Sequence, residues 1–266
     1  MKKVLLLFVT MIAMYGCSSV LLTGRKQLNL VTDEQVLALS DSSYRSFMQT
    51  AAISNKSVEN TRVARVGAKL AAAVEAFMKN EGLQSDLNNL SWSFKLVRDT
   101  SVNAFCMPGG KIVVYEGLLP VTQTDEGLAV VIGHEIAHAV AKHANERMSQ
   151  QMVANYSASA LSSILQNKSQ TTQTVAMVVF GLGAEYGVTM PYSRKQEYEA
   201  DRLGLIFMAM AGYNPKAALD FWKRMSAASD SYIPEILSTH PSDSKRISRL
   251  ESSLPEALKY YPVSSK

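Results

Sequence analysis

The sequence contains too few of the residues that mark several common protein classes. Two cysteines in 266 residues cannot build a disulfide framework. Glycine (14) and proline (8) are too sparse for a collagen-like or low-complexity chain, and the composition is not that of a mainly disordered one. The formal charge is only +4 and the basic residues form no long run, so we expect no nucleic-acid partner.

Only the N-terminal apolar run is a candidate for contact with a membrane. Lysines precede the run Val4–Met14, and Gly16 and Cys17 follow it. This order is typical of a secretory signal, and the run is too short to span a bilayer comfortably. The segment resembles a bacterial lipoprotein signal, in which the cysteine becomes the lipidated first residue. We therefore expect a signal peptide over residues 1–16, and a lipidated Cys17 with a tether over residues 17–31.

Residues 32–266 show no internal repeat and no domain boundary, and the hydrophobic content of 47% suffices for one substantial core. Most of this region has apolar residues at helical spacing, whereas residues 92–96 alternate as in a strand. Pro108-Gly109-Gly110 predicts a turn between two strands. Residues 154–174 are polar and keep only some helical spacing. The helices expected cover about residues 32–48, 58–78, 124–147, 194–210, 215–227 and 242–252. The fold class expected is α+β, mainly helical, with one small sheet.

The expected helix 124–147 contains the motif H-E-x-x-H at residues 134–138. Residues four apart lie about 6 Å apart along a helix and about 40° apart around it, so His134 and His138 can hold one metal ion. Glu135 is offset by about 100°, where it can take a proton from metal-bound water. The alternative is a pair of core histidines, but this leaves the glutamate between them unexplained. The motif therefore predicts a catalytic metal site.

Two histidines leave at least one further protein ligand to find. His143 is about 140° around the helix from His138, so we expect it on the surface or supporting a ligand. Glu197 and Asp201 share a face of a later helix, and Glu199 points about 160° away from Asp201. The pair is either a metal ligand with an orienting carboxylate or a solvated acidic face. The spacing alone leaves both interpretations open.

Four stretches of the chain, together with Leu22–Lys26, carry a resemblance to a known family. They are SVNAFCMPGGKIVVYEGLL (101–119), DEGLAVVIGHEIAHAVAKHANER (125–147), YSRKQEYEADRLGL (192–205) and STHPSDSKRI (238–247). In these stretches the chain resembles the HtpX/BepA/Oma-type gluzincin metallopeptidases, in their compact lipoprotein form. The resemblance implies a zincin-like metalloprotease domain over residues 32–266, with the small sheet beside the motif helix. It also implies one Zn²⁺ per chain, with Glu197 as the third ligand and Asp201 as the partner of a zinc histidine.

Three further expectations concern the surroundings of the zinc. His240 lies before Pro241 and is followed by Arg246, in a stretch similar to one that recurs in the family. Either His240, with Arg246, stabilises the oxyanion or acts as a latch at the open metal position, or His240 caps or packs a helix. The resemblance also implies that Asn103, Ala104 and Phe105 supply an edge strand along which a peptide substrate pairs.

The function expected is that of a zinc-dependent endopeptidase that hydrolyses peptide bonds of misfolded or unassembled cell-envelope proteins through Glu135-activated, zinc-bound water. The alternative is a zinc-stabilised envelope chaperone or assembly factor with latched or low proteolytic activity. The partners expected are polypeptide substrates and a membrane, reached through the lipid on Cys17. Ser18 after this cysteine resembles the signal for transport to the outer membrane, so we expect the chain to face the periplasm from there.

Overall fold

The computed structural model describes residues 17–184, 190–229, 236, 240 and 245–262. The expected signal peptide, residues 1–16, lies outside these residues and stays a prediction. The elements in chain order are β1 (Cys17–Ser19), β2 (Lys26–Leu28), α2 (Asp33–Thr50), α3 (Ser57–Asn80), α4 (Gln84–Leu87), β3 (Ser93–Val97), β4 (Ala104–Met107), β5 (Lys111–Tyr115), a 3₁₀ turn (Glu116–Leu118), α5 (Leu119–Thr122), α6 (Asp125–Val140), α7 (His143–Leu165), α8 (Gln170–Ala184), α9 (Met190–Met210), α10 (Ala217–Ser229), α12 (Arg246–Ala257) and a 3₁₀ turn (Leu258–Tyr260). The mainly helical α+β fold is confirmed.

Helix α6 lies at the centre of the fold and contacts α3, α5, α9, α10 and β4. Its apolar residues point in all directions, and Leu128, Ile132 and Ile136 have no exposed surface. A helix that is apolar on all sides is one that the rest of the domain surrounds. Side chains on α6 are therefore carried by a backbone that cannot shift without disturbing the whole core.

The three-stranded sheet has the order β3-β5-β4, with β3 parallel and β4 antiparallel to β5. Ala104 pairs with Val114, and Cys106 pairs with Ile112. Gly109 and Gly110 connect β4 to β5 with φ angles of +84° and +85°, which glycine adopts without the steric cost that a Cβ brings. The predicted hairpin is confirmed, and β4 is the edge strand next to α6.

The structure corrects the expectation of a tether over residues 17–31. β1 and β2 form an antiparallel hairpin in this segment, in which Ser19 pairs with Lys26. Val20 is only 3% exposed and Gln27 only 4%, because the segment packs against the domain instead of extending from it. Lipidation of Cys17 itself stays a prediction.

The structure also corrects the expected single helix 124–147. α6 ends at Val140, and Lys142 has left-handed backbone angles of φ 54° and ψ 37°. The Lys142 ammonium is bound by Asp33 at 2.6 Å and Asp86 at 2.7 Å, two distant residues that hold this unfavourable conformation. A new helix, α7, then begins at His143.

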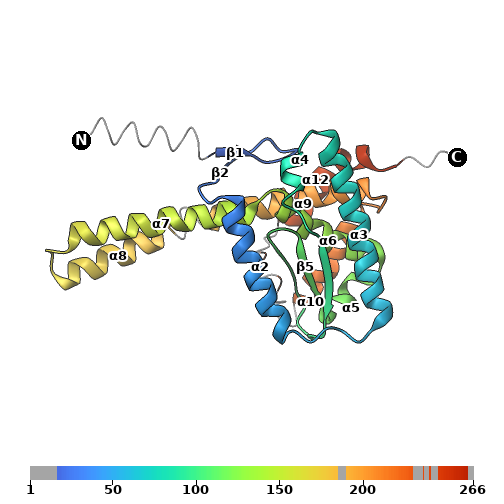
Figure 1. Cartoon of the computed structure of the whole chain (residues 1–266), viewed down its shortest axis with the longest axis horizontal. Coiled ribbons are helices and arrows are strands. Elements are labelled where there is room, and N and C mark those ends of the chain that lie inside the picture. Colours follow the sequence, from blue (N-terminus) through green and yellow to red (C-terminus); the bar gives the residue numbers. More distant parts are fainter. Residues whose placement is uncertain (1–16, 185–189, 230–235, 237–239, 241–244, 263–266) are drawn as a thin grey trace.

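Helices α7 and α8 form a long hairpin that extends away from the sheet and the central helices (Figure 1). The polar residues 154–174 lie within this hairpin: residues 154–165 and 170–174 are helical, and residues 166–169 connect the two helices. Along α7 the buried residues are confined to its first two turns, from His143 to Ser149. None of the helices in the described part of the chain combines the length and the apolar character that crossing a bilayer requires.

Candidate metal centre

The H-E-x-x-H residues lie in the second half of α6. The helix begins at a Thr124 cap, whose hydroxyl accepts a hydrogen bond from the Gly127 amide at 3.1 Å. His134 and His138 are each 6% exposed, and Glu135 is 1% exposed. The predicted helical spacing is confirmed, and both imidazoles lie in the interior of the protein.

Helix α9 brings the carboxylate of Glu197 to these imidazoles. It crosses α6 where Gly204 meets Gly133, and a Cβ on Gly204 would lie only 3.0 Å from the His134 amide nitrogen. Side chains would hold the two backbones apart, so the two glycines permit the close crossing. Glu197 is seven residues before Gly204, two helical turns along the same face, and it therefore points at α6.

Four side chains meet at one point. They are His134, His138, Glu197 and His240, and their potential ligand atoms all lie within 4.8 Å of one another. His138 Nε2 lies 3.0 Å from His134 Nε2. The Glu197 oxygens lie 3.3 Å from His134 Nε2 and 3.4 Å from His138 Nε2. Sequence reasoning thus named every member of the cluster.

The donor set fits zinc. Zinc binds imidazole nitrogen and carboxylate oxygen at about 2.0–2.2 Å in tetrahedral geometry, which places neighbouring ligand atoms about 3.3 Å apart. The separations of 3.0, 3.3 and 3.4 Å among the His134, His138 and Glu197 atoms bracket this value. Nitrogen with one carboxylate also suits zinc better than magnesium or calcium, which prefer oxygen ligands.

The surroundings set the charge states that metal binding requires. Burial lowers the pKa of His138 well below its ordinary value, which favours the neutral imidazole. Burial opposes ionisation of Glu197, but the neighbouring histidines outweigh it and hold the pKa of this carboxyl well below its usual range. Burial also opposes the charged form of His134, yet Asp201 and Glu197 raise its pKa to about 9. Metal binding to His134 therefore displaces a proton.

Glu135 lies beside the cluster and is not one of its members. Burial raises the pKa of its carboxyl group above the ordinary value. Its Oε1 atom has no hydrogen-bond partner among the described residues, and His240 Nε2 is 3.4 Å away. A buried carboxylate oxygen without a donor is available to accept a proton from a bound molecule.

Asp201 contacts the far side of His134. Its Oδ1 lies 2.9 Å from His134 Nδ1, and Arg246 donates hydrogen bonds of 2.7 and 2.8 Å to its two oxygens. The sequence-predicted pairing of Asp201 with a histidine of the motif is therefore present. Arg246 is 2% exposed and contacts Asp201 more closely than Glu197, from which it is 3.8 Å away.

His143 supports His138, which is one of the two places expected for it, whereas the sequence did not indicate the contacts of Glu199. His143 is fully buried, and its Nδ1 lies 2.8 Å from His138 Nδ1. Its Nε2 lies 3.0 Å from Glu199, which also binds Thr23 and Arg25 of the N-terminal hairpin. The support arises because the chain breaks at Lys142 and returns His143 toward His138, which a continuous helix would not do. A third histidine close after the motif was the only signal in the sequence.

The expected edge-strand residues lie in or just before β4, which contacts α6, and they differ in their surroundings. Ala104 begins β4 and has no exposed surface, and Phe105 packs edge-on against Phe47 with ring centroids 5.3 Å apart. Asn103 precedes the strand, and its carbonyl accepts a hydrogen bond from the Tyr115 amide at 3.1 Å. The edge position is observed, whereas pairing with a substrate stays a prediction.

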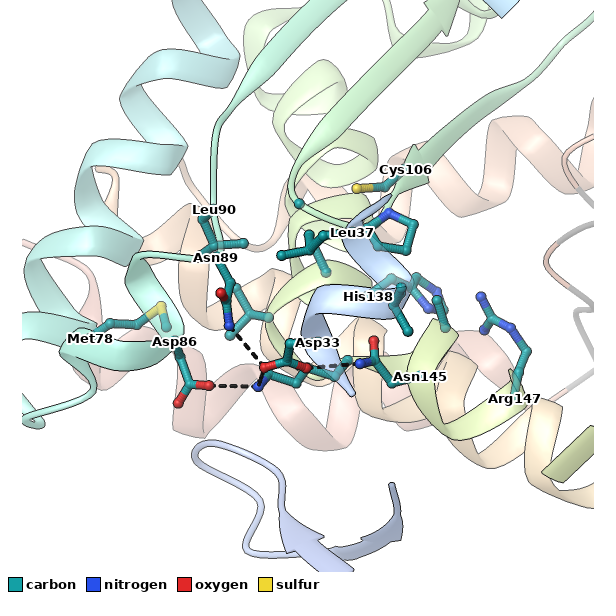
Figure 2. A pocket seen from close by; sticks show the side chains of 17 residues that line it. Asp33, Leu37, Met78, Asp86, Asn89, Leu90, Cys106, His138, Asn145 and Arg147 are labelled. Carbon is teal, nitrogen blue, oxygen red and sulfur yellow. Dashed lines mark hydrogen bonds and ion pairs between the residues drawn. The ribbon is translucent and has the colours of Figure 1, made fainter. Parts of the chain in front are cut away.

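A pocket opens beside His138, between α2, α4, the β4–β5 turn and the α6–α7 junction (Figure 2). Leu37, Leu90 and Cys106 supply an apolar lining. At one side, Asp33 accepts hydrogen bonds from Asn145 at 2.9 Å and Asn89 at 2.8 Å. The pocket therefore combines an apolar interior with a polar, hydrogen-bonded wall.

Comparisons with known proteins extend across most of the chain. The family described as Peptidase family M48 matches residues 57–254. "Mitochondrial metalloendopeptidase OMA1" of Schizosaccharomyces pombe is 37% identical over 188 residues, which is 65% of this chain and 50% of that protein. The human "Metalloendopeptidase OMA1, mitochondrial" is 29% identical over 244 residues, covering 90% of this chain and 46% of that protein. The "Putative beta-barrel assembly-enhancing protease" of Vibrio cholerae is 29% identical over 241 residues, or 88% and 46%. The chain thus spans about half the length of these relatives.

Proposed function

The chain belongs to peptidase family M48, and from this membership we propose that it is a zinc-dependent endopeptidase. We propose further that His134, His138 and Glu197 hold one Zn²⁺ per chain, and that Glu135 is the catalytic base. The observation that carries the proposal is the convergence of the ligand atoms within 4.8 Å, next to a buried Glu135 oxygen that has no hydrogen-bond partner among the described residues.

Glu135 and Asp201 have different roles in the proposed hydrolysis. Zinc, when bound, supplies a Lewis acid that polarises the scissile carbonyl and makes water acidic enough to react near neutral pH. Glu135 accepts the proton of the attacking water on its free oxygen and passes it to the leaving amine. Its raised pKa suits both steps, because a base that must later act as an acid works best when its pKa lies near the working pH. Asp201 keeps the proton of His134 on Nδ1, so that Nε2 is free for the metal.

His240 supports the second candidate, a protein with latched or low activity. Its Nδ1 lies 3.2 Å from both Glu197 and His134, and its Nε2 lies 3.4 Å from Glu135. A side chain in this place occupies the space that a substrate carbonyl and the attacking water need. A latched enzyme, or a zinc-stabilised chaperone or assembly factor of the cell envelope, would rest in this arrangement. A role for His240 or Arg246 in stabilising the oxyanion remains the alternative proposal.

The proposed substrates are misfolded or unassembled proteins of the bacterial cell envelope. Strand β4 lies at a sheet edge beside α6, which is the place where an extended peptide could pair with Ala104 and Phe105, next to Asn103. The neighbouring apolar pocket could hold one apolar side chain of that peptide. The name of the Vibrio cholerae relative is consistent with a substrate in the envelope. A lipid on Cys17 would keep the chain at the membrane, facing the periplasm, as the N-terminal sequence predicts.

The test compares the full chain with its Glu135→Gln variant on an unfolded protein substrate. We expect the wild type to cleave and a chelator to abolish cleavage. Glu135→Gln should retain stoichiometric zinc and its unfolding temperature while losing at least about 100-fold in rate, the usual contribution of a general base. Glu126→Gln, at the start of the same helix, is the matched control and should cleave normally. Normal turnover by Glu135→Gln would exclude the mechanism, and mapping the cut sites would show whether an apolar residue is preferred.

A further inference from the structure

The Nδ1 atoms of the two motif histidines contact two separate sets of residues. His134 Nδ1 contacts Asp201, which Arg246 holds. His138 Nδ1 contacts His143 at 2.8 Å, and His143 Nε2 contacts Glu199 at 3.0 Å. Asp201 and Glu199 are two residues apart on α9, so a single helix supports both imidazoles.

The positions of the protons along the second set follow from which atoms can donate. Glu199 accepts from Thr23 and from Arg25 Nε at 2.7 Å, as an ionised carboxylate does. His143 must therefore donate its Nε2 proton to Glu199, which leaves Nδ1 of a neutral His143 as an acceptor. His138 then donates from Nδ1, and its Nε2 carries the free lone pair. This is the tautomer of His138 that a metal on Nε2 requires.

The last member of the set comes from the far end of the chain. Arg25 precedes β2, and its guanidinium binds Glu199 through Nε and Glu146 through both terminal nitrogens at 2.8 Å. Its side chain is 10% exposed, and the two carboxylates are 6% and 1% exposed. Gly24, with φ +65°, forms the turn that directs Thr23 and Arg25 toward Glu199. The N-terminal hairpin therefore contacts the metal cluster through two intermediate side chains.

We propose that His143 and Glu199 are positioning residues for His138, and that Arg25 of the N-terminal hairpin completes this support. The inference rests on the zinc site proposed above. His143 keeps the His138 ring in the orientation and tautomer for metal binding, and Glu199 does the same for His143. Arg25 holds Glu199 ionised and in place. Outer partners of this kind typically contribute about 10–100-fold to metal affinity.

The competing interpretation is that Arg25 has a purely structural role, because its contact with Glu146 also attaches the N-terminal hairpin to α7. The two interpretations differ in what a substitution changes. If a substitution only detaches the N-terminal hairpin, the free energy of unfolding falls equally in the metal-free and the metal-loaded protein. Loss of positioning lowers the zinc affinity, and therefore the stability that zinc adds.

The experiment measures the zinc dissociation constant of the full chain by competition with a chromophoric chelator, and the unfolding temperature with zinc and with excess chelator. His143→Ala should weaken zinc binding about 10–100-fold. His143→Asn should retain most of the affinity, because its side-chain oxygen can take the place of the Nδ1 acceptor. Arg25→Ala should weaken binding in the same direction as His143→Ala but by less. Arg202→Ala is the matched control: it removes the two-bond ion pair between Arg202 of α9 and Glu256 of α12 and should leave zinc affinity unchanged.

The outcomes separate this inference from the proposed function. Unchanged zinc affinity in both His143→Ala and Arg25→Ala, with a normal wild type, would overturn the positioning role and leave the zinc site intact. Equal affinities of His143→Asn and His143→Ala would likewise contradict the proton assignment. A wild-type chain that binds no zinc would instead refute the proposed function itself.

Discussion

Arg246 donates two hydrogen bonds to Asp201, with Nε 2.8 Å from Oδ2 and Nη2 2.7 Å from Oδ1. The guanidinium also lies 3.5 Å from the centre of the Trp222 ring, a cation–π contact that helps to hold it in place. Burial opposes ionisation of Asp201, but Arg246 and His134 outweigh it and lower the pKa of this carboxyl below its ordinary value. Asp201 is therefore an ionised acceptor for the Nδ1 proton of His134.

We predict that Asp201→Ala weakens both zinc binding and the fold. Zinc affinity should fall about 10–100-fold, because His134 loses the group that fixes its tautomer. The free energy of unfolding of the metal-free protein should fall by about 3–5 kcal/mol, because the Arg246 charge remains buried without its partner. Chelator competition and denaturant unfolding measure the two effects. Arg202→Ala, which breaks a surface ion pair between α9 and Glu256 of α12, should cost about 1 kcal/mol or less and leave zinc affinity unchanged. An Asp201→Ala protein with wild-type zinc affinity would contradict the assignment.

The features that were predictable from the sequence are those that depend on local spacing. Thr32 and Gln35 form a capping box at the start of α2, as their spacing of three residues favours. The stripe Val63, Val66, Leu70 and Val74 is fully buried on α3, as its helical period predicts. The i,i+4 spacing of His134 and His138 is likewise confirmed by their shared contact with Glu197. In each case the residues that decide the structure are within a few turns of one another.

The features that were missed depend on residues distant in the sequence. α6 ends early because Asp33 and Asp86 hold Lys142 in a left-handed conformation. The resulting break places His143 against His138, whereas a continuous helix would turn it away. Arg25 is 121 residues from Glu146 and 174 from Glu199, so no local pattern could connect them. Each of these features therefore depends on contacts between segments distant in the sequence, which local spacing does not describe.

We predict that Gly204→Ala is destabilising although alanine favours helices. The new Cβ would lie 3.0 Å from the His134 backbone nitrogen and 3.1 Å from the Gly133 carbonyl carbon, so α9 must move away from α6. The free energy of unfolding should fall by about 1–3 kcal/mol, a typical cost of overpacking. Zinc affinity should fall as well, because the movement carries Glu197 away from the histidines.

The matched control for this prediction is Gly181→Ala. Gly181 also lies in a helix, but a Cβ at this position would have no described heavy atom within 4 Å outside its own stretch of helix. The same substitution there should leave the unfolding free energy unchanged or raise it by up to about 1 kcal/mol, through helix propensity alone. Equal effects at the two positions would show that the close crossing of α6 and α9 is not required.

We predict that the contribution of Glu199 to stability disappears in acid. Burial opposes its ionisation, but hydrogen bonds from His143, Thr23 and Arg25 outweigh burial and lower its pKa from 4.5 to about 2. The folded state therefore binds a proton less readily than the unfolded state. The stabilisation is complete above about pH 5 and is lost as the pH falls from 4.5 toward 2.

The comparison of wild type with Glu199→Gln measures this contribution. The free energy of unfolding of both proteins is determined with excess chelator, from about pH 6 to about pH 2.5. This pH range spans most of the expected loss of stability. The wild type should be the more stable protein at the upper end of this range, and the difference should shrink as the pH falls. A difference that stays constant over this range would mean that the Glu199 carboxylate has the same pKa in the folded and unfolded chains.

The final prediction concerns His240, which contacts both the metal cluster and Glu135. If His240 is a latch, His240→Ala retains zinc through His134, His138 and Glu197 and cleaves an unfolded protein faster than the wild type. The gain should appear in kcat/KM, because the open site is populated more often before substrate binds. The double variant His240→Ala with Glu135→Gln is the control and should be inactive, which assigns the gain to the same site.

The opposite result is equally informative, because the two roles of His240 predict opposite signs. A histidine that stabilises the oxyanion contributes only in the transition state, so its loss would lower kcat by about 100–1,000-fold with zinc still bound. The distances favour the latch: a group that waits for an oxyanion should leave the cluster open, whereas His240 Nδ1 already lies 3.2 Å from Glu197 and from His134. Its Nε2 is at the same time 3.4 Å from the Glu135 oxygen that must accept a proton. If His240 is a latch, substrate has to displace it before Glu135 can act, and activity should increase when this side chain is removed.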